Sequence, residues 1–227
     1  VEKTEKMKVC TCLNPIHTAL AVFGCLLSYK KISDEMGDPL LKQLVHTLGY
    51  KEGLPVVTDP GIIDPEVFLA EVLTERVANP FLPDTPQRIA TDTSQKLAVR
   101  FGETLKTYAE RKDTELKDLT AIPLVIAGWF RYLLGTDDKG CAFELSPDPM
   151  LDYLRKHMEA VKEGVGGDCD TALDPILSNE VIFGVDLLAL GLGRKIKSMF
   201  TEMTEGNGAV AATLSKYLQA EDEKQQE

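Results

Sequence analysis

Apolar residues recur along this chain at the spacing of helices and not at the spacing of strands. The clearest stripe consists of Leu40, Leu41, Leu44, Val45 and Leu48. Asp38 and Pro39 stand directly before this stripe, and Gly49 follows it. Asp at the N-cap and Pro at the first helical position start helices, and glycine commonly ends them. The pattern therefore predicts a helix between Asp38 and Gly49 with one buried face.

Two longer segments are apolar on nearly every side. Asn14 and Pro15 form a helix-start signal before the apolar residues 19–27, with Asn14 as the expected N-cap. A second segment, residues 119–134, ends at Gly135. Apolar residues on all sides of a helix indicate burial. Weaker patterns predict further helices at 65–78, from Gln87 or Asp92 to Arg111, and at 149–163, 187–203 and 210–220.

The segment 7–13 differs from the rest of the chain. It is short and rich in Cys and β-branched residues, a composition that favours an extended segment. About eight helical segments and no other strand pattern predict an all-α fold, a multi-helical bundle. Residues 1–220 are expected to form one helical domain with a flexible break at 164–167, and residues 221–227 a charged, frayed tail.

Composition and charge exclude several classes of partner. Among 227 residues, 36 are acidic and 25 are Lys or Arg, so the net charge is −11. Binding to nucleic acid or to an anionic membrane needs clustered cations, so no nucleic acid and no membrane partner is expected. The longest apolar run, residues 121–130, is about half as long as a bilayer span requires. A small molecule or a protein remains as the partner.

The cysteines and glycines also argue against common site types. Five cysteines are an odd number, which fits a reducing, cytoplasmic location better than a disulfide framework. Cys10 and Cys12 lack a second pair or a nearby His, so no metal site is expected. The glycines at 164–167 and at 191–193 do not match a dinucleotide-binding fingerprint.

One candidate for catalytic chemistry is the group Lys8, Asn14 and His17, where the predicted extended segment meets a helix start. Unpaired N–H groups and the helix dipole favour a developing oxyanion there, and an amide side chain adds a donor. The dipole and nearby cations should keep His17 neutral. Lys8, if desolvated, could have its pKa lowered towards the ~7–8 that suits a general base. The alternatives are that Asn14 is only a helix cap and that His17 is a surface residue. His46 and His157 lack polar neighbours in sequence and are interpreted as structural.

A second group of polar residues follows further along the chain. Arg88, Asp92 and Lys96 are spaced by four residues each, so a continuous helix would place them on one face. Arg88 and Lys96 could bind the oxygens of a polyhydroxylated or carboxylated substrate, for which the planar fork of arginine is well suited. A solvated ladder of charges, or Asp92 as a helix cap, explains the same spacing.

These two groups lie within two ordered motifs. Residues 8–21 resemble the pattern K-x-x-x-x-N-x-x-H-[ST]-x-L-A of the mannitol dehydrogenase family, the long-chain polyol and hexuronate dehydrogenases. Residues 76–80 and 88–97 resemble that family's blocks R-x-x-N-P and R-I-A-x-D-[GT]-S-x-K. Weaker similarity continues through residues 123–135 and into the final helices, so the resemblance covers nearly the whole chain.

The resemblance implies a C-terminal helical domain of the type seen in 6-phosphogluconate dehydrogenase, preceded by a Rossmann domain that holds NAD or NADP. The opening Val1, in place of Met, fits a piece of a longer polypeptide. Family members interconvert a sugar alcohol or aldonate with its keto form without a metal, and mannonate/fructuronate chemistry is preferred here to mannitol/fructose. Lys8 would be the general acid/base, Asn14 would polarise the reacting oxygen and His17 would orient it. Arg88 and Lys96 would hold outer oxygens of the substrate.

The lysine departs from the family pattern. The family's lysine stands five residues before the asparagine, where this chain has Val9, and Lys8 stands six before it. A bulge in the extended segment could absorb the extra residue, and Lys8 is kept as the expected base. The shift leaves open a non-catalytic helical module that binds a sugar acid or regulates. A purely structural interaction domain would leave Arg88 and Lys96 on an open helical face.

Overall fold

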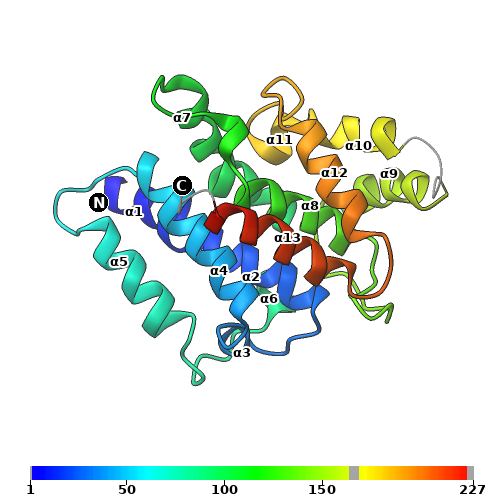
Figure 1. Ribbon diagram of the computed structural model, residues 1–227, viewed down its shortest axis with the longest axis horizontal. Coiled ribbons are helices and arrows are strands. Elements are labelled where there is room, and N and C mark those ends of the chain that lie inside the picture. The colour runs from blue at the N-terminus through cyan, green and yellow to red at the C-terminus, as the bar shows by residue number, and fades with distance from the viewer. Residues whose placement is uncertain (1, 164–168, 224–227) are drawn as a thin grey trace.

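The computed structural model describes residues 2–163 and 169–223, and this part of the chain consists of helices joined by turns and irregular loops (Figure 1). Its β pairing consists of a single isolated bridge between Thr136 and Ala142. The predicted all-α bundle is confirmed. The α-helices are α1 Glu2–Met7, α2 Asn14–Leu26, α3 Ile32–Glu35, α4 Pro39–His46, α5 Pro65–Glu71, α6 Pro86–Ile89, α7 Glu103–Glu110, α8 Ala121–Leu133, α9 Leu151–Glu163, α10 Cys169–Leu177, α11 Glu180–Phe183, α12 Gly193–Met203 and α13 Ala209–Glu223.

Short π and 3-10 segments, labelled η, connect or extend several of these helices. The π-helices are η1 Lys8–Cys12, η2 Thr47–Gly53, η4 Val72–Arg76 and η6 Ala98–Gly102. The 3-10 turns are η3 Leu54–Val56, η5 Thr93–Gln95 and η7 Leu116–Asp118.

Helices α2 and α8 form the centre of the core, and the other helices surround them (Figure 1). Every residue of α8 is buried. Gly128 allows α8 to approach α2, because a Cβ at this position would lie 2.6 Å from Cζ of Phe23. Glu52 satisfies the start of α8: its carboxylate accepts from the N–H groups of Thr120, Ala121 and Ile122 at 2.5–2.8 Å. The one charged residue of α8, Arg131, donates to the carbonyl of Met203 and so pairs with α12.

The structure corrects the prediction of an extended segment at residues 7–13, because residues 7–12 are helical. Met7 ends α1, and Lys8–Cys12 continue as the π-helix η1. The expectation of an extended segment relied on β-branched residues, but local propensity is weak against the burial of Cys10, Thr11 and Cys12 in the core. The helical run Glu2–Leu26 is long and apolar enough to cross a membrane, and most of its apolar part is buried inside the domain.

The break between η1 and α2 has a local cause. Pro15 has no N–H, so the backbone hydrogen-bond ladder lacks one donor where η1 meets α2. Leu13 leaves helical geometry and is the N-cap of α2, whereas Asn14 is the first helical residue. The prediction that Asn14 is the cap is therefore wrong by one position.

Two further predicted helices differ from the structure. The helix expected from Gln87 or Asp92 to Arg111 is divided into α6, η5, η6 and α7, because Asp92 adopts a left-handed conformation with φ of 55°. Gly49 does not end α4, since η2 continues to Gly53. The predicted start at Asp38 is confirmed, and its carboxylate accepts from the N–H groups of Leu40 and Leu41.

The C-terminal third agrees in part with the expectations. Helix α9 begins at Leu151, and α12 at Gly193, six residues after the predicted start at 187. Helix α13 continues to Glu223, so the first residues of the predicted tail are helical. The predicted flexible break at 164–167 and the residues 224–227 lie outside the described part of the chain.

Candidate functional site

The start of α2 forms the centre of the candidate site. The irregular residue Leu13 links η1 to α2: its N–H donates to Lys8 O at 3.0 Å, and its carbonyl accepts from His17 N at 3.1 Å. Asn14 is half-buried, and the segment that precedes it carries Lys8. A helix start concentrates unpaired N–H groups and positive potential, so an oxygen that gains negative charge is stabilised here.

His17 lies in the first turn of α2 and is half-buried. Burial lowers its pKa to about 4, and the positive charges of Arg76, Arg100 and Arg88 act in the same direction. The imidazole is therefore neutral at neutral pH, as the sequence predicted. The prediction named the helix dipole and nearby cations as the causes, whereas burial is the largest cause here and the cations are Arg76, Arg100 and Arg88. A neutral imidazole can both donate and accept a hydrogen bond to a hydroxyl or carbonyl group.

Arg100 is a residue of the candidate site that the sequence analysis did not identify. Its Nη1 donates to Oγ1 of Thr18 at 2.6 Å, and this hydroxyl in turn donates to the carbonyl of Asn14 at 3.0 Å. Burial lowers the pKa of Arg100 to about 10, so the group stays charged at neutral pH. Arg100 follows Lys96 by four residues, a spacing that could have pointed to it. Arg76 was also missed, although it opens the R-x-x-N-P block.

Arg88 and Lys96 are not on one face of a continuous helix, because Asp92 interrupts the helix between them. Arg88, on α6, is 61% exposed and forms an ion pair with Asp84. It also lines an open hollow of about 630 Å³ together with Gln87, Glu144, Leu145, Ser146, Pro147, Leu151 and Arg155.

Lys96 lies beside the end of α6. Its Nζ donates to the carbonyls of Thr91 and Ile89, at 2.5 and 3.5 Å. Burial lowers the pKa of Lys96, and the charge of Arg100 lowers it further, which places these two cations near each other. Neighbouring Ser94 is fixed by Asp148, whose carboxylate accepts from its N–H and its hydroxyl. The motif R-I-A-x-D-T-S-x-K therefore forms short turns held by hydrogen bonds, and its residues do not share one face of a helix.

Lys8 is on η1 and half-buried. Its ammonium lies 5.4 Å from the centre of the Phe68 ring on α5, a cation–π contact. The electrostatic contacts thus connect His17 with Arg76, Arg88 and Arg100, and connect Arg100 with Lys96. The π-helix η1, which carries Lys8, packs against α2 and η6, whereas the Lys8 ammonium itself contacts Phe68 of α5 and not these residues.

The π-helix between Lys8 and Asn14 bears on the displaced lysine. A π turn closes with a hydrogen bond between residues i and i+5, one residue more than an α turn, as from Leu13 N to Lys8 O. The turn accommodates one additional residue without moving its first residue far around the helix. A lysine six positions before Asn14 can therefore occupy the place that a lysine five positions before it would take in an unbroken α-helix.

The described residues contain no group of three or more His, Cys, Asp and Glu side chains that could hold a metal ion. The charged side chains at the start of α2 are cations, a set that suits an anionic or oxygen-rich organic ligand.

Comparison with known proteins assigns this helical domain to a family. Residues 1–204 match the family described as the mannitol dehydrogenase C-terminal domain. A D-mannonate oxidoreductase of Thermotoga maritima is 58% identical over 222 residues, 98% of this chain and 41% of that protein. A mannitol 2-dehydrogenase of Pyricularia oryzae is 32% identical over 219 residues, 96% of this chain and 40% of that protein. The chain belongs to the mannitol dehydrogenase family and corresponds to the C-terminal domain of its members.

Comparison with solved structures finds the same fold in a mannitol 2-dehydrogenase. The structure of Pseudomonas fluorescens mannitol 2-dehydrogenase, a ternary complex with NAD and D-mannitol, superposes with a TM-score of 0.79. That match covers 96% of this chain and 41% of the neighbour at 23% identity, so it shows a shared fold. The chain spans about two fifths of the length of the relatives it matches.

Proposed function

We propose that this domain supplies the acid/base and substrate-binding residues of an NAD(P)-dependent oxidoreductase that interconverts a sugar alcohol or aldonate with its keto form. The observation that carries the proposal is the neutral His17 at the start of α2, whose pKa is lowered by burial and by the charges of Arg76, Arg100 and Arg88. In a chain of net charge −11, this cation cluster favours an anionic substrate. The T. maritima relative supports a D-mannonate/D-fructuronate pair in preference to mannitol/fructose.

Each predicted residue has a role in this reaction. In the oxidation of a secondary alcohol, Lys8 in its amine form takes the hydroxyl proton as the carbonyl forms. Asn14 and the helix start stabilise the developing charge on the oxygen, and His17 orients it by a hydrogen bond. Arg88 and Lys96 bind outer oxygens of the substrate. A bound nicotinamide cofactor would supply the hydride acceptor, and a Rossmann domain outside this chain would hold it. No metal takes part in the proposed reaction.

The displaced lysine is compatible with these roles. The π turn η1 absorbs the extra residue between Lys8 and Asn14, which supports Lys8 as the acid/base group. In the structure the ammonium of Lys8 lies over Phe68, so the proposed role requires another side-chain rotamer of Lys8.

The test uses the full-length protein with D-fructuronate and NADH. Lys8→Ala and His17→Ala are expected to lower kcat by about 10²–10⁴-fold, the usual contribution of general acid–base groups. Lys3→Ala, which removes an exposed lysine of α1, is the matched control and should keep full activity. Unchanged turnover in both variants would contradict the assigned roles.

The alternative, a non-catalytic module that binds a sugar acid, has one observation in its favour: the Lys8 ammonium contacts Phe68. Calorimetric titration of the full-length protein with D-mannonate distinguishes the two. Binding without any NADH-coupled turnover would show the module, and turnover would show the enzyme.

A further inference from the structure

Arg100 carries a charge that the rest of the described chain does not balance. Within residues 2–163 and 169–223, no carboxylate forms an ion pair with it, and its hydrogen-bond partner is the neutral hydroxyl of Thr18. Its charge lowers the pKa of Lys96, a neighbouring cation, and the pKa of His17, whose imidazole it helps to keep neutral. A partly buried charge among like charges is costly, and such arrangements concentrate at functional sites.

The joint between η1 and α2 explains why an anchor is needed at this place. Pro15 donates no backbone hydrogen bond, so the first turn of α2 is joined to η1 by fewer backbone bonds than in an unbroken helix, among them those of Leu13 to Lys8 and His17. The segment 98–110, made of η6 and α7, contacts both sides of this joint. On the α2 side Arg100 binds Thr18, and on the η1 side Oγ1 of Thr104 donates to Cys10 O at 3.2 Å.

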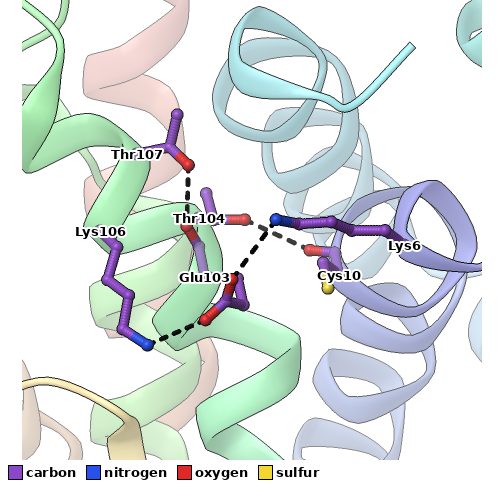
Figure 2. Close-up of polar contacts among 6 residues, drawn as sticks. All are labelled: Lys6, Cys10, Glu103, Thr104, Lys106 and Thr107. Carbon is purple, nitrogen blue, oxygen red and sulfur yellow. Dashed lines mark hydrogen bonds and ion pairs between the residues drawn. The ribbon is translucent and has the colours of Figure 1, made fainter. Parts of the chain in front are cut away.

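Figure 2 shows the contacts that segment 98–110 makes on the η1 side of the joint. Glu103 forms ion pairs with Lys6 of α1 at 3.5 Å and with Lys106 of its own helix at 2.9 Å. These ion pairs lie next to the hydrogen bond from Thr104 to Cys10 O. Helix α1 is therefore attached to α7 by an ion pair, and η1, which carries Lys8, by a hydrogen bond. The α2 side depends on Arg100 and the buried hydroxyl of Thr18, which is 2% exposed.

We propose that Arg100 is a positioning residue of this site, which fixes the first turn of α2 through the Thr18 hydroxyl and thereby places Asn14 and His17. The inference rests on the proposed function and adds a residue to it. Arginine suits the task because its planar group can hold Thr18 with one nitrogen while its charge faces His17. That charge, with those of Arg76 on η4 and Arg88 on α6, favours the neutral imidazole.

The decisive comparison is between Thr18→Val and Thr18→Ser in the full-length protein. Valine has the shape of threonine without the hydroxyl, and serine keeps the hydroxyl. Thr18→Val is expected to lower kcat about 10-fold or more with a smaller change in KM, because misplacement by about 1 Å can cost 10²-fold. Thr18→Ser should restore most of the loss. Equal kcat in the two variants, within twofold, would overturn the proposal.

Variants of Arg100 separate its bond from its charge. Arg100→Met should lower kcat by about 10–10²-fold and also raise the pKa of His17, whereas Arg100→Lys keeps the charge and should leave the pKa of His17 low. Lys112→Met is the control, since it removes an exposed cation that lies just after α7 and takes no part in these contacts. An Arg100→Met variant with unchanged kcat and unchanged His17 pKa would overturn the proposal.

The pKa of His17 is measured on the 227-residue chain by NMR, which does not depend on turnover. The chain has three histidines, and the spectrum of His17→Gln assigns the signal. If the full-length protein turns over no sugar acid, the proposed function fails. The positioning role is then judged on the α2 amide shifts: changes at Asn14 and His17 in Thr18→Val but not in Thr18→Ser support it, and identical spectra overturn it.

Discussion

Glu35 and Gly24 are in direct contact, because the Glu35 carboxyl fills the space that a Cβ on Gly24 would need. Pro86, the first residue of α6, borders the same space. The contact therefore joins α2 to α3 and to the helix that carries Arg88. Glu35 is fully buried, and both of its carboxyl oxygens lack a hydrogen-bond partner within the described residues.

Gly24→Ala is expected to destabilise the domain. The added methyl would overlap the Glu35 carboxyl and Cγ of Pro86, and overpacking of this kind costs about 1–3 kcal/mol. Urea unfolding measures the free energy of unfolding. Gly37→Ala is the control, because its nearest neighbour would be the Asp34 carbonyl at 3.2 Å. Equal losses in the two variants would contradict the packing argument.

Glu35 also predicts a pH dependence of stability. Burial, together with the charges of Asp38 and Asp34, raises its pKa to about 10. The folded state therefore holds a proton that the unfolded state releases near pH 4.5. Stability falls as the pH rises above 4.5 towards 10, by at most about 1.4 kcal/mol per pH unit for this group.

Glu35→Gln removes this titration. The free energy of unfolding of the variant relative to the wild type should increase between pH 5 and pH 9, measured by urea unfolding at each pH. Parallel curves for the two proteins across this range would show that Glu35 titrates alike in the folded and unfolded states.

His17 predicts the opposite sign. Its pKa is about 4 in the folded state, against 6.5 for the free side chain, because burial and three arginines disfavour the charged imidazole. The stability contributed by the neutral form is fully present above pH 6.5 and is lost as the pH falls towards 4. His17→Gln should therefore lose less stability than the wild type between pH 7 and pH 4.5. A larger loss in the variant, measured by urea unfolding, would contradict the assignment.

The sequence predicted those parts of the fold whose causes are local. The Asp38-Pro39 start of α4 and the buried helix α8 follow from capping chemistry and from an apolar run. It did not predict the helical state of residues 7–12, because β-branched and Cys residues favour strands while burial against the core selects a helix. The left-handed Asp92 was missed for a similar reason, since its N–H bonds to the distant Pro147 carbonyl.

The candidate site shows the same division. His17 and its neutral state followed from its place at a helix start, and the motif blocks pointed to Arg88 and Lys96. The four-residue spacing from Lys96 could have pointed to Arg100, but its contact with Thr18, 82 residues earlier in the chain, could not be predicted from a single sequence. A contact between such distant segments leaves no periodic signal in either of them.

The most specific prediction concerns the spacing of the lysine. The double variant Lys8→Val/Val9→Lys moves the ammonium to five residues before Asn14, the spacing of the family pattern, and preserves the composition of η1. If the π turn already compensates for the extra residue, this exchange turns the lysine away from the site. The full-length double variant should then be as impaired as Lys8→Ala, with kcat lower by about 10²–10⁴-fold. Activity equal to or above the wild type would show that the register of the family pattern, and not the π turn, decides where the base must stand.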